Sequence, residues 1–373
     1  MEVLGQNSGS NHEEMSESGK DLAIEFAILR LPVEMLVRFK CVSQYWRDLI
    51  NSEEFQSLYL HHSNTSRDKF HVFVSSRRRQ GQKNIHKLGF VDDTPNQVLQ
   101  EIYSKRFKKD YEIVGSCNGL ICLYCDMEFK LALWNPFTRR YKMLPMAKVN
   151  RIQGGEQHLS HGLGCVKDDY KVVQIIQSFK KGNLLETEIK VYSLKLNSWT
   201  KVEDFPFGGS DFPNNGCFLD GDLYWLAWTK PTAKHLLVRF ELEAEKFDQL
   251  ELPNVDDSAE LHLGVLGGCL SMCESKEDSA VIWVVKKRVP WAVQDIVRLE
   301  DSDQASYFKI MPLAYTNKGK KLLLAVGFNT LLWYDLKDNE AKEFFLPRFT
   351  KGFEAVMCIE SLVSLGVDSK ADE

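Results

Sequence analysis

Residues 131–145 read LALWNPFTRRYKMLP, and the expected fold rests on this stretch and its copies. An apolar run is joined to a second run with bulky residues, and Asn135-Pro136 stands between them. Asparagine and proline favour chain reversals. Short apolar runs separated by such residues are typical of antiparallel strands. The stretch therefore predicts a strand, a turn and a strand.

Similar stretches recur along the chain. The clearest copies are IKVYSLKLNSWTKV (189–202), LVRFELEAEKFDQLELP (237–253) and TLLWYDLKDNEAKEFFLP (330–347), with weaker ones near 85–90 and 281–286. Their anchor residues are His86, Trp134, Tyr192, Phe240, Trp283 and Tyr334. The anchors lie roughly 50 residues apart, which is close to the kelch period. Because one blade cannot bury its apolar face alone, we expect an all-β, kelch-like propeller of about six blades. A two-sheet sandwich with irregular hairpins is the alternative.

The first sixty residues have a different pattern. Residues 1–19 are polar and lack apolar periodicity, so we expect a disordered tail. A short apolar helix should follow from about Asp21, and a second one should begin near Pro32. Apolar residues then recur every three or four positions from Leu36 to Leu49, which predicts one helical face. A unit this short needs a partner surface for that face, either on another protein or on the larger domain as a packed cap.

The stretch LPVEMLVRFKCVSQYWRDLINSEEF, residues 31–55, resembles the second half of a plant F-box. The resemblance implies a three-helix motif that docks on a Skp-family adaptor, and through it on cullin and RING subunits. The adaptor-binding positions that it implies are Ile24, Ile28, Leu31, Pro32, Leu36, Phe39, Val42, Trp46 and Leu49. An F-box normally begins with a Leu-Pro pair, whereas this chain has Gly19 and Lys20 there. The departure implies weaker docking.

The later repeats resemble the F-box-associated domain found behind plant F-boxes. Matching phrases include VGSCNGLICL (114–123), LDGDLYWLAW (219–228) and LGVLGGCLSM (263–272). The expected fold class is α+β multidomain, with a three-helix F-box before the propeller. The expected organisation is a tail at 1–19, an F-box at 20–62, a β-propeller-like substrate-binding domain at 68–366 and a disordered tail at 367–373.

Catalytic and metal-binding motifs are missing from the sequence. It contains no Walker loop, no G-x-S-x-G elbow and no H-E-x-x-H helix. We expect His158 and His161 to be solvated loop residues. Cys122 and Cys125 fall on one predicted strand with their side chains on opposite faces, which favours core thiols over a zinc site. No catalytic residue, metal or cofactor is expected.

Charge and cysteine usage restrict the class of partner and the compartment. The net charge of −5 provides no global field that would attract nucleic acid or anionic lipid. No apolar run approaches the roughly 18 residues of a membrane helix. Nine scattered cysteines suit a reducing compartment, so we expect a protein of the cytoplasm and nucleus without nucleic-acid or membrane partners.

The function that the resemblance implies is a non-catalytic one. It is the substrate-recognition subunit of an SCF (Skp-cullin-F-box) E3 ubiquitin ligase, whose propeller binds a target protein for ubiquitination and proteasomal degradation. The residues do not identify the target. One alternative is a non-degradative interaction module with weakened adaptor binding. Another is an enzyme or carbohydrate-binding propeller, which predicts converging His, Asp or aromatic residues at the axial pocket.

Overall fold

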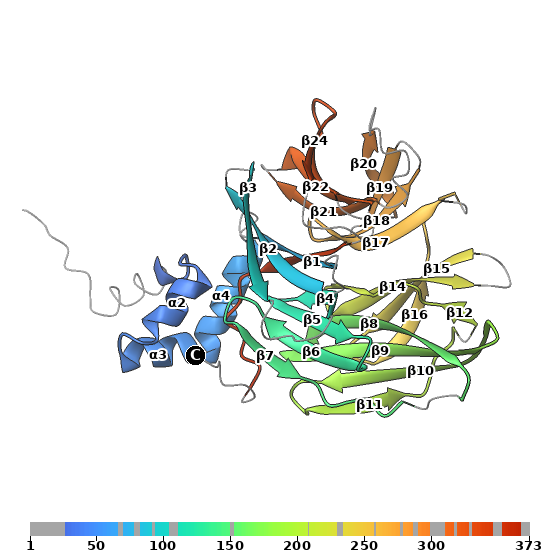
Figure 1. Ribbon diagram of the computed structural model, residues 1–373, viewed down its shortest axis with the longest axis horizontal. Helices are drawn as coiled ribbons and strands as arrows, with labels where there is room; N and C mark the ends of the chain where they lie inside the picture. Colours follow the sequence, from blue (N-terminus) through green and yellow to red (C-terminus); the bar gives the residue numbers. More distant parts are fainter. Residues whose placement is uncertain are drawn as a thin grey trace, which may run out of the picture.

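A small group of helices lies beside a large body of β-sheets in the computed structural model of the chain (Figure 1). The structure describes residues 27–65, 70–77, 83–91, 94–103, 111–149, 153–207, 209–229, 234–256, 259–276, 279–285, 290–298, 310–316, 319–327, 330–345 and 353–366. Both expected tails therefore lie outside the described residues, as do Gly19, Lys20, Ile24 and most of the first expected helix.

In the part of the chain that the structure describes, three complete helices precede the sheets: α2 (Val33–Phe39), α3 (Gln44–Asn51) and α4 (Glu53–Thr65). The helix expected near Pro32 is confirmed, because Pro32 is the N-cap of α2. Ser43 caps α3 by accepting a hydrogen bond from the Trp46 backbone N–H at 3.3 Å. Ser52 accepts one from the Phe55 backbone N–H at 3.2 Å. These two caps divide the apolar stretch into separate helices.

The described strands form six antiparallel sheets, numbered here in chain order. Sheet 1 consists of β25 (Phe353–Ile359), β1 (Phe70–Arg77), β2 (Lys83–Val91) and β3 (Thr94–Tyr103). Sheet 2 consists of β4 (Glu112–Cys117), β5 (Leu120–Cys125), β6 (Lys130–Asn135) and β7 (Arg140–Met143). Sheet 3 consists of β8 (Glu156–Val166), β9 (Asp169–Lys180), β10 (Asn183–Ser193) and β11 (Ser198–Val202).

The remaining sheets continue the same order. Sheet 4 consists of β12 (Ser210–Asp211), β13 (Cys217–Leu219), β14 (Asp222–Thr229), β15 (Lys234–Glu241) and β16 (Lys246–Leu250), with β12 and β13 both paired to β14. Sheet 5 consists of β17 (Glu260–Leu266), β18 (Cys269–Ser275), β19 (Ser279–Val285) and β20 (Ala292–Arg298). Sheet 6 consists of β21 (Ile310–Thr316), β22 (Lys321–Val326), β23 (Thr330–Asp335) and β24 (Glu340–Phe345).

One edge strand of each sheet contacts its counterpart in the next sheet. The contacts run from β25 to β4, β8, β13, β17 and β21, and then back to β25. This closed circuit is the arrangement of a propeller, so the mostly β, propeller-like expectation is confirmed and the sandwich alternative is wrong. The last described strand, β25, pairs with the first, β1, and so closes the circuit within sheet 1.

The six repeat anchors occupy equivalent positions. His86, Trp134, Tyr192, Phe240, Trp283 and Tyr334 lie on β2, β6, β10, β15, β19 and β23, which are the third strands of their sheets counted from the inner edge. Trp134, Tyr192, Phe240 and Tyr334 are fully buried. A large aromatic ring on the third strand therefore fills the space between neighbouring sheets in most repeats.

The cysteine expectation for β5 is confirmed. Cys122 packs in a cluster with Leu133 and Leu163, between sheets 2 and 3. Cys125 packs on the other side of the strand, in the cluster that the helices share. All nine cysteines are free thiols. Cys122 and Cys125, three residues apart on one strand, therefore lie in two separate hydrophobic clusters.

The segment 360–365 after β25 is largely buried and is called the closing segment below. Asn135, at the end of β6, holds it: Nδ2 donates to the carbonyl oxygens of Ser361 and Val363 at 3.0 and 3.1 Å. Its Oδ1 accepts from the backbone N–H groups of Phe137 and Thr138 at 3.0 and 3.1 Å. The asparagine of the opening stretch therefore forms the turn and also fixes the C-terminal end.

Replacing Asn135 with aspartate should lower the free energy of unfolding by about 3 kcal/mol or more. The carboxylate keeps both turn bonds, but it loses two donors and faces two carbonyl oxygens in a buried site. Urea denaturation measures the change. Asn197→Asp is the matched control, because exposed Asn197 uses Oδ1 only to accept from the Tyr192 hydroxyl, at 2.8 Å. Equal losses in the two variants would contradict the role given to the Nδ2 bonds.

Candidate functional site

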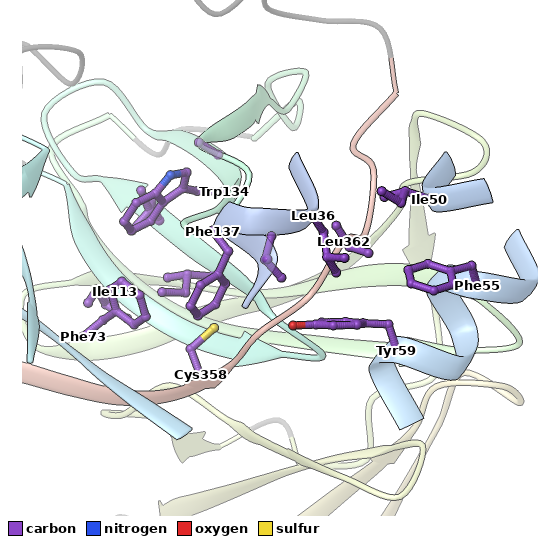
Figure 2. Packing of buried hydrophobic residues seen from close by; sticks show 14 of the residues in the cluster. Leu36, Ile50, Phe55, Tyr59, Phe73, Ile113, Trp134, Phe137, Cys358 and Leu362 are labelled. Carbon is purple, nitrogen blue, oxygen red and sulfur yellow. The ribbon is translucent and has the colours of Figure 1, made fainter. Parts of the chain in front are cut away.

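The helices α2 to α4, with residues 27–32, form a unit called the helical module below. Its buried side chains share one hydrophobic cluster with sheets 1 and 2 and with the closing segment (Figure 2). The cluster joins Leu36, Ile50, Phe55 and Tyr59 to Phe73, Ile113, Trp134, Phe137, Cys358 and Leu362. The module is thus packed on the propeller through a continuous core.

A buried carboxylate also links the module to the propeller. Glu360 of the closing segment accepts from the Val33 backbone N–H at 3.0 Å and from the Tyr59 hydroxyl at 2.8 Å. Its other oxygen lies 3.1 Å from His71 Nε2 on β1. The Tyr59 hydroxyl also lies 2.9 Å from the Leu31 carbonyl. One side chain therefore connects the start of α2, the middle of α4 and sheet 1.

The partners of Glu360 determine its protonation state. Burial alone raises the pKa of this carboxyl, but the hydrogen bonds from His71, Val33 and Tyr59 outweigh burial and lower the pKa to about 2. The same burial and the negative charge of Glu360 raise the pKa of the Tyr59 hydroxyl. Glu360 is therefore an ionised acceptor at neutral pH, and Tyr59 is a neutral donor.

The residues expected to bind an adaptor divide into groups by exposure. Ile28 and Leu36 are buried in the module's own core, with Leu36 at 0% exposure. Leu31, Phe39, Trp46 and Leu49 are partly buried and pack against the same cluster. Pro32 and Val42 are exposed. The propeller therefore covers Ile28 and Leu36 in this structure, and adaptor binding through the nine positions stays a prediction.

An exposed apolar patch lies on the outer side of the module. Val42 is 69% exposed, Tyr45 is 54% exposed, and Met35 is also exposed. The Tyr45 ring meets that of Trp46 edge to face, with ring centroids 5.3 Å apart. Periodicity alone favoured the stripe from Leu36 to Leu49 and missed Met35 and Tyr45. The signal that could have found them is an apolar residue on the otherwise charged side of a helix.

A central channel with a volume of ≈ 510 Å³ lies among the inner strands. Contacts along it show that neighbouring inner strands run in the same direction: Ile113 N–H donates to Glu354, and Ser116 Oγ donates to the Met357 carbonyl. Most of the lining residues are apolar, Glu112, Glu354 and His262 are among the others, and none of the described lining residues is lysine or arginine. The loops before β8, β13 and β17 each lead into an inner strand, so they open on one face of the channel.

The histidine expectation is wrong about the loop and about the burial of His161, whereas His158 is exposed as expected. His158 and His161 belong to strand β8, and His161 is almost completely buried. Its ring lies 4.5 Å from that of Tyr124, centroid to centroid. Burial lowers the pKa of His161 to about 4, against a smaller opposing effect of its hydrogen bond to Asn215. The stretch was assigned to a loop because glycines and polar residues hide the alternation of the strand.

Within the described ranges, no group of three or more His, Cys, Asp or Glu side chains is arranged to hold a metal ion. Among the helices that the structure describes, none combines the length and apolar character that a membrane span requires.

Comparison with known proteins gives concordant matches. Residues 57–361 match the family described as the F-box associated beta propeller domain, which begins inside α4. The F-box protein CPR1 of Arabidopsis thaliana is 30% identical over 367 residues, which cover 90% of this chain and 86% of the relative. An F-box/kelch-repeat protein of Arabidopsis thaliana is 30% identical over 282 residues, covering 71% of this chain and 74% of the relative.

Proposed function

Because this chain belongs to the plant family that carries the F-box-associated β-propeller domain, we propose that it is the substrate-recognition subunit of an SCF E3 ubiquitin ligase. In this role the helical module binds a Skp-family adaptor, and through it the cullin and RING subunits. The propeller holds a target protein for ubiquitination and degradation by the proteasome. The chain itself needs no catalytic residue, since ubiquitin transfer belongs to other subunits.

The observation that carries the proposal is the exposed apolar patch on a module whose other side is packed against the propeller. Met35 lies on α2, Val42 in the turn after it and Tyr45 on α3, and the opposite side of these helices is already buried against the propeller. Exposed apolar patches of this kind mark protein interaction sites. An adaptor seated there stays clear of the channel, because the module packs on sheets 1 and 2 from outside.

We also propose that each of the six sheets is one blade and that the target binds on the face where the inner strands begin. The loops between sheets open on that face, and loops on a rigid scaffold commonly carry recognition. The channel mouth lies at the centre of this face. This arrangement puts adaptor and target on different sides of one rigid body.

Co-purification with a Skp-family adaptor tests the role. The variant Val42→Asp with Tyr45→Ala should bind at least about tenfold more weakly than the native chain, since each apolar side chain contributes about 1.5–3 kcal/mol when buried. Leu36 is left unchanged because it belongs to the core. Adaptor affinity is measured by titration of purified proteins.

The matched control is Leu196→Asp with Leu185→Ala, two propeller residues that are 72% and 54% exposed. This control should bind the adaptor like the native chain. If the folded native chain captures no adaptor, the ligase role fails and the non-degradative module takes its place, with Gly19 and Lys20 as the expected cause. If both double variants weaken adaptor binding equally, the exposed apolar patch is not the adaptor-binding surface.

The cytoplasm and nucleus are proposed as the compartments of the protein. Nine free thiols in one chain suit a reducing environment. Imaging of a fluorescent fusion in plant cells checks this, and accumulation in the secretory pathway would contradict it.

A further inference from the structure

A second, smaller cavity lies between sheets 2 and 3. Its volume is ≈ 80 Å³. Leu131 comes from β6, Met146 from the connection to β8, Leu159 and Gln174 from β8 and β9, and Trp199 from β11. The neighbouring sheets can be followed in Figure 1 by the labels β6 to β11. Every residue of the wall is uncharged.

Gln174, one of the residues that line the cavity, carries a buried acceptor that nothing in the described chain uses. Gln174 is only 3% exposed, and its Oε1 has no hydrogen-bond partner among the residues that the structure describes. Its Nε2 lies 3.2 Å from His161 Nε2. A buried carbonyl oxygen without a donor costs free energy, so a ligand that supplies the donor gains what the free protein lacks.

The hydrogen bonds of His161 fix the orientation of this amide. Burial keeps the imidazole neutral at physiological pH, so one ring nitrogen carries a proton and the other accepts. The Asn215 Oδ1 accepts from the His161 backbone N–H at 2.9 Å. Because an amide nitrogen only donates, His161 Nε2 accepts an N–H from Gln174 Nε2. The Gln174 carbonyl oxygen is consequently on the side of the amide away from His161.

The size of the cavity restricts the ligand. A cavity of about 150 Å³ holds benzene, whereas one water needs only about 10–15 Å³. The volume of ≈ 80 Å³ therefore suits about three heavy atoms. A carboxylate, phosphate or ammonium group would lose its hydration against uncharged walls without gaining an ionic partner.

We propose that this cavity receives a threonine side chain of a bound protein, with the methyl group among the apolar residues and the hydroxyl donating to Gln174 Oε1. The inference rests on the proposed function, because it describes the chemistry of a residue in the target. Threonine has the three heavy atoms that the volume admits beyond its Cα, and it combines one apolar branch with one neutral donor. Phosphorylation of that threonine would prevent entry.

The test uses capped amino acids and the full chain with isotope-labelled methyl groups. N-acetyl-threonine amide should shift the methyl resonances of Met146, Leu131 and Leu159 in a saturable way. N-acetyl-valine amide has the same shape without the hydroxyl, and it should bind about threefold to tenfold more weakly, the difference expected from one neutral hydrogen bond. N-acetyl-phosphothreonine amide should leave these resonances unchanged.

Two variants test the contribution of the Gln174 acceptor and that of the cavity space independently. Gln174→Met keeps the size and removes the acceptor, so threonine and valine probes should then bind equally. Ala147→Phe fills the cavity from an adjoining loop without touching Gln174, and should abolish binding of both probes. Unchanged resonances of Leu263 and Val265 in the channel show that each variant is folded.

Equal binding of the two probes to the native chain would overturn the proposal, as would undiminished binding to Ala147→Phe. Adaptor capture is measured separately on the same preparations. Threonine binding without adaptor capture would refute the ligase role and leave this site in place. Adaptor capture without threonine binding would refute only the site.

Discussion

Glu360→Gln is expected to lower the free energy of unfolding by about 3 kcal/mol at neutral pH, the value of removing a buried charged acceptor from its donors. Glutamine can present one oxygen to the Val33 N–H and the Tyr59 hydroxyl, but its amide then turns two hydrogens toward His71. Because the helical module and sheet 1 both depend on this carboxylate, they should loosen together. Urea denaturation followed by tryptophan fluorescence measures the loss.

The effect of this carboxylate should also depend on pH in a defined direction. Its pKa is lowered from 4.5 to about 2 in the folded chain, so the unfolded chain binds the proton more tightly. The stability that Glu360 contributes is therefore complete above about pH 4.5 and is lost as the pH falls toward 2. Of a total of about 3 kcal/mol, about 2 kcal/mol should be gone at pH 3. The native chain and the variant should thus converge in stability between pH 6 and pH 3.

Glu203→Gln is the control for charge removal alone. Glu203 is exposed and pairs with Lys201 at 3.0 Å on the surface. Such pairs contribute about 0–1 kcal/mol, so this variant should unfold nearly like the native chain. A stability difference between the native chain and Glu360→Gln that stays constant from pH 6 to pH 3 would show that the carboxylate is not held as described.

Gly119→Ala is the second change with a large expected effect, a loss of about 3–5 kcal/mol. Gly119 has a φ of +81°, in the left-handed region that disfavours a side chain. A Cβ there would lie 2.0 Å from the Cβ of Ser361 and 3.0 Å from the carbonyl oxygen of Ile359. The free-energy costs of backbone strain and of displacing the closing segment would add to each other. The urea midpoint and the pull-down of an adaptor should both fall.

Gly154→Ala separates the backbone strain from the steric contact with the closing segment. Gly154 has a φ of +72°, and an added Cβ would meet no atom within 4 Å. Only backbone strain remains, so the expected loss is about 1–2 kcal/mol. If the two alanine variants unfold at the same urea concentration, the contact between Gly119 and the closing segment contributes nothing to stability.

The repeats were the most predictable part of the fold. Aromatic anchors such as Trp134 and Tyr334 stand near the turn residues of each copy, so local pattern was enough to find the third strand of every sheet. The β8 strand was missed because the stretch around His161 carries glycines that pack closely: a Cβ on Gly162 would lie 2.8 Å from the Trp225 ring. Because such glycines serve contacts between sheets, they interrupt the alternating apolar pattern by which a strand is recognised in the sequence.

The surface that covers the helices could not be predicted from the sequence. Periodicity identified the stripe that contains Leu36, but it could not say which surface covers the stripe. Some of the covering residues, such as Leu362, stand more than three hundred positions away in the sequence. The role of Glu360 was even less predictable. A single acidic residue in an apolar stretch forms no sequence pattern, and its hydrogen-bond donors Val33, Tyr59 and His71 come close to it only in the folded chain.

The hydrogen bond between Val33 and Glu360 spans 327 positions, and this has a consequence for synthesis on the ribosome. At about 5–20 residues per second, roughly 15 to 65 seconds pass between translation of the first partner and translation of the last. During that interval the emerged helices expose the apolar side that later becomes core. A nascent chain therefore needs chaperone protection until the closing segment leaves the exit tunnel, and a message truncated shortly before this segment yields a product that cannot close.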